Sequence, residues 1–151
     1  MAASDCTLVK GTRLVYGTDG ATYPNTFADL VEIGPPGSLK RPKIDKTPLD
    51  PFTSNREYGL GLGEPGVQTF KQLWTRARET ALVALVGVPT YYRVLYPDSA
   101  TNVDANKSSD SFYGSISGLT KEPMPNADAR LVLDVEITIS GPITFVSGTG
   151  V

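Results

Sequence analysis

Two carboxylates, Asp134 and Glu136, stand two residues apart in a run where apolar and polar residues alternate. In a β-strand such residues point to the same face, where paired carboxylates can serve as general acid and general base. The alternating apolar residues Leu133, Val135 and Ile137 are expected to form the buried face of that strand. The pattern therefore places the carboxylates in solvent or in an aqueous channel, and it favours a surface role over catalysis.

Three glycines, Gly61, Gly63 and Gly66, match the G-x-G-x-x-G pattern of dinucleotide-binding folds. That motif requires an apolar strand before the glycines, and residues 55–60 do not form such a run. An acidic residue is also expected at the end of a second strand about 20 residues later, where residues 83–88 are wholly apolar. The glycines therefore predict a loop and no cofactor.

The alternating residues Asn102, Asp104 and Asn106 are similar to the start of a calcium-binding loop. Lys107 stands where that loop requires glycine, and Tyr113 stands where the bidentate glutamate is needed. The pattern therefore predicts a turn-rich loop and no metal site.

Tyr91, Tyr92 and Tyr96 form a cluster in the sequence that is compatible with a platform for binding sugars. Aromatic residues that alternate along a strand are more typical of core and sheet packing. Packing is the favoured interpretation of this cluster.

The composition excludes most other catalytic mechanisms, because they require histidine or several cysteines. The chain has no histidine, which excludes Ser-His-Asp and Cys-His catalysis and histidine-ligated zinc. The single cysteine, Cys6, excludes an intrachain disulfide and a thiolate cluster, and it fits a reducing compartment. A formal net charge of −2 gives no overall electrostatic footprint for nucleic acid or a membrane. The sequence predicts a protein that is not an enzyme, with no catalytic, cofactor-binding or metal-binding residues.

The length of 151 residues predicts a single domain over residues 1–151. With 15 glycines and 12 prolines, the composition favours turns and β-structure. The first ten residues lack a basic region followed by an apolar run, so no signal peptide is expected. The longest apolar run is far shorter than the roughly 20 residues of a membrane span. We therefore expect synthesis in a cytoplasm and no membrane association.

Alternation with a period of two residues defines the strands that carry these side chains. It is strict over residues 130–139, which predicts a strand with one buried face. Ser140-Gly141-Pro142 is expected to end that strand, with residues 143–146 as a short partner. Gly114 and Gly118 share one face of a second strand and predict a bulge or a close neighbour. The remaining strand candidates are residues 112–121, 91–96, 8–16, 27–33 and 42–49. Six strands at short spacing indicate a sandwich or a barrel.

One segment has helical periodicity. Its apolar stripe comprises Phe70, Leu73, Trp74, Ala77, Ala81, Ala84 and Leu85. Gly87 followed by Pro89 supplies a stop, so we expect a helix over residues 76–86. The pattern alone leaves residues 67–74 open between strand and helix.

The stretch 50–66 reads as a long loop, because it holds two prolines and four glycines without clear periodicity. Loops longer than about 12–15 residues in a compact domain are usually functional or disordered. This one carries four large apolar residues, Phe52, Tyr58, Leu60 and Leu62. Exposed apolar side chains indicate a covering surface, so these four are candidate contacts between subunits or rings.

The order of these elements resembles the major tail protein of long-tailed bacteriophages, which is the tail tube subunit. The run PKIDKTPLD at residues 42–50 is similar to the family's ID-x-T-x-LD strand, which leads into a long loop. The other similar segments are the helix ALVAL at 81–85, the strand YRVLYP at 92–97, and the final strands at 112–117 and 129–141. Each motif is short, and their order along nearly the whole chain carries the resemblance.

The resemblance implies a mainly β (α+β) fold, an antiparallel β-sandwich or half-barrel with one flanking helix and a long inter-subunit loop. It also favours a strand at residues 67–74. Subunits of this family close into hexameric rings that stack into a hollow tube around a tape-measure protein, and DNA later passes through. The implied partners are copies of the chain, the tape-measure protein, the tail terminator, and distal tail or baseplate proteins. The implied location is the virion tail, assembled in the host cytoplasm.

Asp134, Glu136 and Thr138 share the strand face opposite the apolar stripe, and we expect this face to line the lumen. A neutral or acidic lining would let DNA slide without tight binding, because counterion release on a basic wall would hold phosphate. Arg130 on the same predicted face does not fit this expectation.

Two other functions stay open. The chain is also compatible with a different tail ring component, namely a tail terminator or a distal tail protein. A function of another class is a small monomeric β-sandwich module that binds a ligand through the tyrosine cluster. Long tubes, single rings and monomers would distinguish the three.

Overall fold

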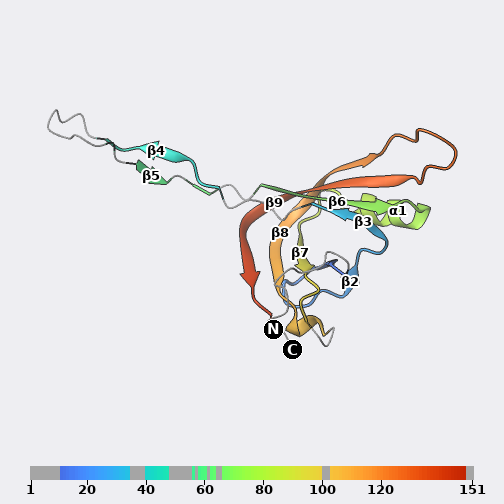
Figure 1. Cartoon of the computed structure of the whole chain (residues 1–151), viewed down its shortest axis with the longest axis horizontal. Helices are drawn as coiled ribbons and strands as arrows, with labels where there is room; N and C mark the ends of the chain where they lie inside the picture. Colours follow the sequence, from blue (N-terminus) through green and yellow to red (C-terminus); the bar gives the residue numbers. More distant parts are fainter. Residues whose placement is uncertain are drawn as a thin grey trace, which may run out of the picture.

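The computed structural model of the chain describes residues 11–34, 40–47, 56, 58–60, 62–63, 66–99 and 103–148. Within them the protein is mainly β, with a seven-stranded sheet, a separate two-stranded hairpin and one α-helix (Figure 1). The elements are β1 (Arg13–Gly17), β2 (Asn25–Thr26), β3 (Leu30–Ile33), β4 (Lys43–Asp45), β5 (Tyr58–Leu60), β6 (Val67–Leu73), α1 (Arg76–Leu85), β7 (Thr90–Leu95), the 3₁₀-helix η1 (Asp104–Asn106), β8 (Ser109–Lys121) and β9 (Val132–Val146).

The large sheet is antiparallel and curls into a half-barrel, because a short stretch of chain joins its two ends. Its strand order is β2-β1-β7-β8-β9-β6-β3, yet only residues 27–29 separate β2 from β3 in the sequence. Residues 27–29 form backbone hydrogen bonds with both β1 and β6. The Phe27 amide donates to the Leu14 carbonyl at 3.0 Å, and the Leu73 amide donates to the Asp29 carbonyl at 3.1 Å. The half-barrel predicted by the resemblance is confirmed.

The core lies inside the curl and is built by alternation along the long strands. On β9, Leu133, Val135 and Ile137 are fully buried, while the residues between them lie on the opposite face. The Phe27 ring packs between the rings of Tyr16 and Phe70, with centroid distances of 4.6 and 4.8 Å. The segment that joins the sheet ends therefore also plugs the core.

The strand end predicted at Ser140-Gly141-Pro142 is wrong, because β9 runs through these residues. The strand continues to Val146 and pairs with β8 on both sides of this segment. Ser111 pairs with Thr144 and Tyr113 with Ser140, so three β9 residues stand opposite one β8 residue, and Gly141 adopts φ +88°. Glycine and proline here form a bulge inside a strand instead of ending it. Residues 143–146 are thus part of β9 and not a separate partner.

The two glycines of β8 have the predicted surroundings. A Cβ on Gly114 would lie 2.3 Å from the carbonyl oxygen of Thr138, so the neighbouring backbone leaves no room for a side chain. A register shift between Ile116 and Gly118 forms the predicted bulge. Both expectations for this strand are confirmed.

Helix α1 begins after Thr75, whose hydroxyl accepts from the Arg78 amide at 3.2 Å, and it ends one residue before the predicted limit. No helix in the described part of the chain is both long and apolar enough to cross a membrane. The predicted buried stripe is wrong, because Phe70 belongs to strand β6, where the period is two. Leu82 is the buried helical residue, whereas Ala77 and Ala81 are exposed.

The structure also settles the segment left open between strand and helix, and it changes the bounds of the shorter predicted strands. Residues 67–73 are strand, as the family resemblance favoured. The strand expected over 27–33 is confined to 30–33, since Phe27 turns into the core. The strands expected over 8–16 and 42–49 appear as β1 and β4, and residues 8–10 and 48–49 lie outside the described part.

Candidate assembly surfaces

A hairpin arm, formed by β4 and β5, extends from one end of the long axis of the molecule (Figure 1). Its register pairs Lys43 with Leu60 and Asp45 with Tyr58, so these four side chains share one face. The stretch expected to be a structureless loop thus contains a strand at residues 58–60, which corrects that expectation. Alternation over only three residues is too short to be recognised in the sequence.

The arm exposes the apolar residues that the sequence singled out. Tyr58 is 50% exposed, Leu60 66% and Leu62 90%. Phe52, the fourth candidate, lies outside the described residues. An isolated two-stranded hairpin is marginally stable in water, so this arrangement favours a covering surface.

The β4 side of the arm is basic. Residues 40–47 carry Lys40, Arg41, Lys43 and Lys46 against Asp45, a net charge of +3. The ammonium of Lys43 lies 4.6 Å from the Tyr58 ring centroid, a cation–π contact. Hydrogen bonds from the hydroxyl and amide of Thr47 lower the pKa of Asp45. A partner for this surface should be apolar with acidic groups nearby.

The open face of the sheet holds the candidate lumen residues. Glu136 and Thr138 are exposed and Asp134 is half-buried, and all three alternate with the buried residues of β9 as predicted. Arg130 is exposed and lies two residues before β9, which begins at Val132, so it is not part of the strand.

This face is acidic. Lys71 pairs with Asp134 across β6 and β9, and its ammonium lies 2.7 Å from Glu122 and 3.4 Å from Glu32. The Glu122 carboxylate, together with Glu32, raises the pKa of Lys71. Lys71 thus contacts Glu32 and Glu122, and Asp134 and Glu136 lie on the same face, so these four carboxylates and one cation have a net charge of −3. We call this set the acidic face.

The two longest strands leave parts of their edges without a strand neighbour among the described residues. Strand β7 pairs with β8 only from Ser109 to Gly114, and Ile116 adds one bridge to Val86. Strand β6 pairs with β9 only as far as Thr138. Within the described part of the chain, residues 117–121 of β8 and 140–146 of β9 thus have a strand neighbour on one side only, and we call these two segments the free edges. Phe145, on the second free edge, is 54% exposed.

A groove of about 370 Å³ lies on the same open face of the sheet, where it covers β7, β8 and the C-terminal part of β9, and we call it the tyrosine groove. Tyr91 and Tyr113 stand opposite each other on paired strands, with ring centroids 4.7 Å apart. The Arg93 guanidinium lies 4.3 Å from the Tyr23 ring centroid, and its Nε donates to the Ser111 hydroxyl at 3.0 Å. Sequence reasoning missed this site, because only strand pairing brings Tyr23 and Tyr113 to Tyr91.

The tyrosine cluster read from the sequence does not form one surface. Tyr92 is fully buried, and this burial raises its pKa to about 12. Tyr96 is half-buried and donates to Asp110, and burial likewise raises its pKa. The packing interpretation is confirmed for Tyr92, while Tyr91 alone reaches the groove.

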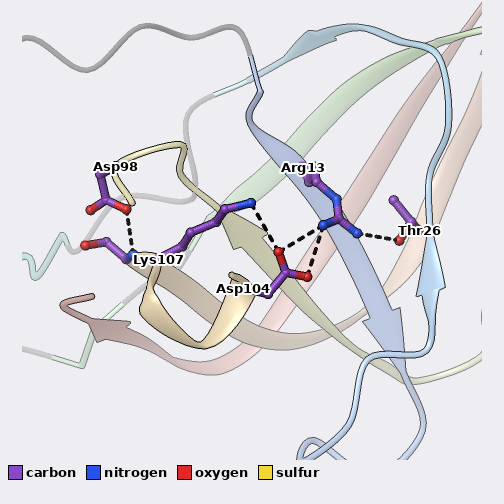
Figure 2. Close-up of polar contacts among 6 residues, drawn as sticks. Arg13, Thr26, Asp98, Asp104 and Lys107 are labelled. Carbon is purple, nitrogen blue, oxygen red and sulfur yellow. Dashed lines mark hydrogen bonds and ion pairs between the residues drawn. The ribbon is translucent and has the colours of Figure 1, made fainter. Parts of the chain in front are cut away.

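Asp104, a candidate calcium ligand in the sequence, is engaged by two cations (Figure 2). Its carboxylate accepts from Arg13 at 2.9 and 3.0 Å and from the Lys107 ammonium at 3.1 Å. Arg13 also donates to the Thr26 hydroxyl at 3.2 Å. This cluster attaches η1 to the edge of the sheet. The G-x-G-x-x-G motif of Gly61, Gly63 and Gly66 is followed directly by strand β6, whereas a dinucleotide-binding motif leads into a helix.

No family model and no curated protein matches the sequence. Solved structures do match over nearly the whole chain. The sheath/tube terminator of an extracellular contractile injection system, PVC, superposes with a TM-score of 0.73 at 7% identity, covering 97% of this chain and 100% of that one. The tail of an empty GTA particle, with C6 symmetry, gives 0.62 at 14% identity, covering 94% and 100%. The SPP1 tail tube gives 0.61 at 11% identity, covering 95% and 82%.

These likenesses define the class of fold: an antiparallel half-barrel shared by tail tube and tube-terminating proteins of phage-like particles. The chain is tail-tube-like in its fold, as the order of its sequence motifs predicted.

Proposed function

We propose that the chain is a structural subunit of a phage-like tail tube, which polymerises as stacked hexameric rings. The observation that carries this proposal is the pair of free edges on β8 and β9. Free edges are templates for pairing with another chain, and natural monomers usually cover or blunt them. The two edges belong to different surfaces of one subunit, so pairing between copies is head-to-tail and closes as a ring when the rotation permits.

The fold supports a sixfold ring. The GTA tail, which shares the half-barrel, has C6 symmetry. In a ring built through the free edges, the sheets of neighbouring subunits join and their open faces line a channel. The acidic face then forms the channel wall around a tape-measure protein, and DNA passes along it without tight binding.

The arm supplies the other contact that a tube requires. The arm extends beyond the sheet (Figure 1) and exposes Tyr58 and Leu60, and Leu62, also exposed, follows β5, so these side chains can bridge to a neighbouring subunit or to the next ring. Covering each such side chain contributes about 1.5–3 kcal/mol, which can offset the ordering cost of the arm. The remaining partners are a tail terminator and distal tail or baseplate proteins, and the location is the virion tail.

A tube terminator is the second candidate. The PVC terminator superposes with a TM-score of 0.73, above the 0.61 of the SPP1 tail tube. A terminator would form one ring and stop, whereas a tube subunit stacks many rings.

Electron microscopy of the purified chain tests the proposal. We expect long tubes, either on concentration or after addition of a nucleating tail fragment. Single rings at every concentration would favour the terminator function. Monomers under all these conditions, confirmed by sedimentation from low to high salt, would overturn both.

A further inference from the structure

The tyrosine groove presents more binding chemistry than its own subunit uses. Its walls offer aromatic faces from Tyr23, Tyr91 and Tyr113. Arg93 is fixed by the Tyr23 ring and the Ser111 hydroxyl, and no carboxylate in the described part of the chain pairs with it. A preorganised guanidinium beside aromatic walls fits an apolar segment that carries a carboxylate.

The connection between β8 and β9, residues 122–131, has this complementary chemistry, and we call it the hairpin tip. Pro123, Met124 and Pro125 are all exposed, and Met124 is 64% exposed. Asn126 then makes the turn, because its side chain accepts from the Asp128 amide at 3.0 Å. The Asp128 carboxylate is exposed and contacts no cation among the described residues.

Grooves lined by aromatic side chains are the usual receptors for extended proline-rich segments, whose fixed φ angles lower the entropy lost on binding. Methionine sulfur adds favourable contacts with aromatic rings. We propose that the tyrosine groove of one subunit holds the Pro123-Met124-Pro125 tip of the next subunit, with Asp128 facing Arg93. This inference rests on the self-assembly proposed above and names the residues of one of its contacts.

The tip cannot reach the groove of its own subunit. From Tyr113 in the groove to Lys121 at the base of the tip, β8 runs eight extended residues, about 26 Å. The tip and the C-terminal end of β9 also lie far apart along the hairpin (Figure 1). A contact between tip and groove is therefore a contact between two copies.

The free edges place the two surfaces next to each other. The free edge of β8, residues 117–121, runs directly into the tip. The free edge of β9 borders the groove, which is lined in part by Ser140, Pro142 and Thr144. When the β8 edge of one copy pairs with the β9 edge of another, β8 of the first copy, which continues into the tip, lies next to the β9 residues that line the groove of the second.

Disulfide crosslinking of the assembled full-length chain tests this contact. In a Cys6→Ser background, the pair Met124→Cys and Tyr113→Cys should give a ladder of covalent oligomers on a non-reducing gel. A mixture of the two single variants should give the mixed dimer. The matched control pairs Met124→Cys with Val83→Cys, which is also exposed but lies on α1. It should not crosslink.

A second measurement does not depend on new cysteines. Met124→Ala should raise the concentration for half-assembly at least about fivefold, as loss of a buried contact residue does. Val103→Ala, an exposed apolar truncation elsewhere, should leave it unchanged. Normal tubes or rings with no crosslink between residues 124 and 113, or with equal crosslinking to residue 83, would overturn this inference and leave the proposed function standing. No assembly by the unmodified chain would overturn both.

Discussion

At the scale of single residues, Asp104 balances a buried charge. Lys107 is only 2% exposed in its side chain, and Asp104 is its ion-pair partner. We expect Asp104→Asn to lower the free energy of unfolding by about 1–3 kcal/mol, less than for a fully buried pair because Asp104 is half exposed. Denaturant unfolding measures this loss.

The control for that prediction is Asp128→Asn, which removes a carboxylate that contacts no cation among the described residues. Its effect should stay within about 0.5 kcal/mol. Adding Lys107→Met to Asp104→Asn should recover stability, because the uncompensated charge is then gone. An Asp104→Asn protein as stable as the unmodified chain would show that water satisfies Lys107.

Glu79 should make folding sensitive to acid. It accepts from the Trp74 indole at 2.7 Å and pairs with Lys121 at 2.9 Å, and these contacts lower the pKa of Glu79. Because the folded state favours the carboxylate, its contribution to stability is complete above the ordinary pKa of 4.5. It is lost as pH falls through the lower folded-state value.

The only tryptophan of the chain reports on this change. Trp74 fluorescence should titrate with a midpoint below that of an ordinary glutamate, and Glu79→Gln should abolish the step. A midpoint at or above 4.5 would mean that the indole hydrogen bond does not stabilise the carboxylate in solution.

At the scale of elements, periodicity predicted the strands and the helix, but not the continuity of β9. Ser140-Gly141-Pro142 has the composition of a turn, and only the pairing of β8 on both sides shows that it is a bulge. The helix was predicted within one residue, whereas its buried face was not. The apolar stripe was divided between β6 and α1, whose periods differ, so one helical projection could not describe both.

The free edge of β9 should control assembly. Phe145→Lys together with Val146→Lys places two cations along the edge, a device by which natural sheets prevent edge pairing. We expect rings and tubes to be lost while the circular dichroism spectrum and the melting temperature of the subunit stay unchanged. Val103→Lys, at a similarly exposed residue outside the sheet, is the matched control and should assemble normally. Tubes formed by the double variant would show that the ring closes elsewhere.

The arm should become protected only on assembly. Its three paired positions and exposed apolar side chains give little local stability, so hydrogen exchange at Tyr58–Leu60 should be fast in the free subunit. In tubes the same amides should exchange far more slowly, because a neighbour covers them. Core strand β9 should be protected in both states. Equal exchange of the arm in both states would contradict its role as a bridge.

At the scale of the whole molecule, charge is separated along the chain in a way that the net value of −2 conceals. Residues 40–47 of the arm carry +3, whereas the acidic face carries −3. The sequence identified Asp134, Glu136 and Thr138 through alternation alone. It could not identify Glu32 and Glu122, because both reach this face only through Lys71 on a neighbouring strand.

The acidic face leads to a prediction for assembled tubes. Wild-type tubes should not retain a short DNA duplex even at low salt, because a negative wall releases no counterions from phosphate. Glu136→Lys adds two charge units per subunit on this face. It should retain DNA inside the channel, with an affinity that falls steeply as salt rises. The retained duplex should resist nuclease, since the wall of the tube surrounds it.

The matched control adds the same charge on the other side of the sheet. Ala77→Lys with Ala84→Lys also adds two charge units, on exposed residues of α1, which packs against the core face through Leu82. DNA bound there lies outside the tube, so nuclease should digest it. Protection in the helix variant but not in Glu136→Lys would reverse the assignment of the channel wall. Tight, salt-sensitive retention of protected DNA by wild-type tubes would show that the wall holds its cargo instead of letting it slide.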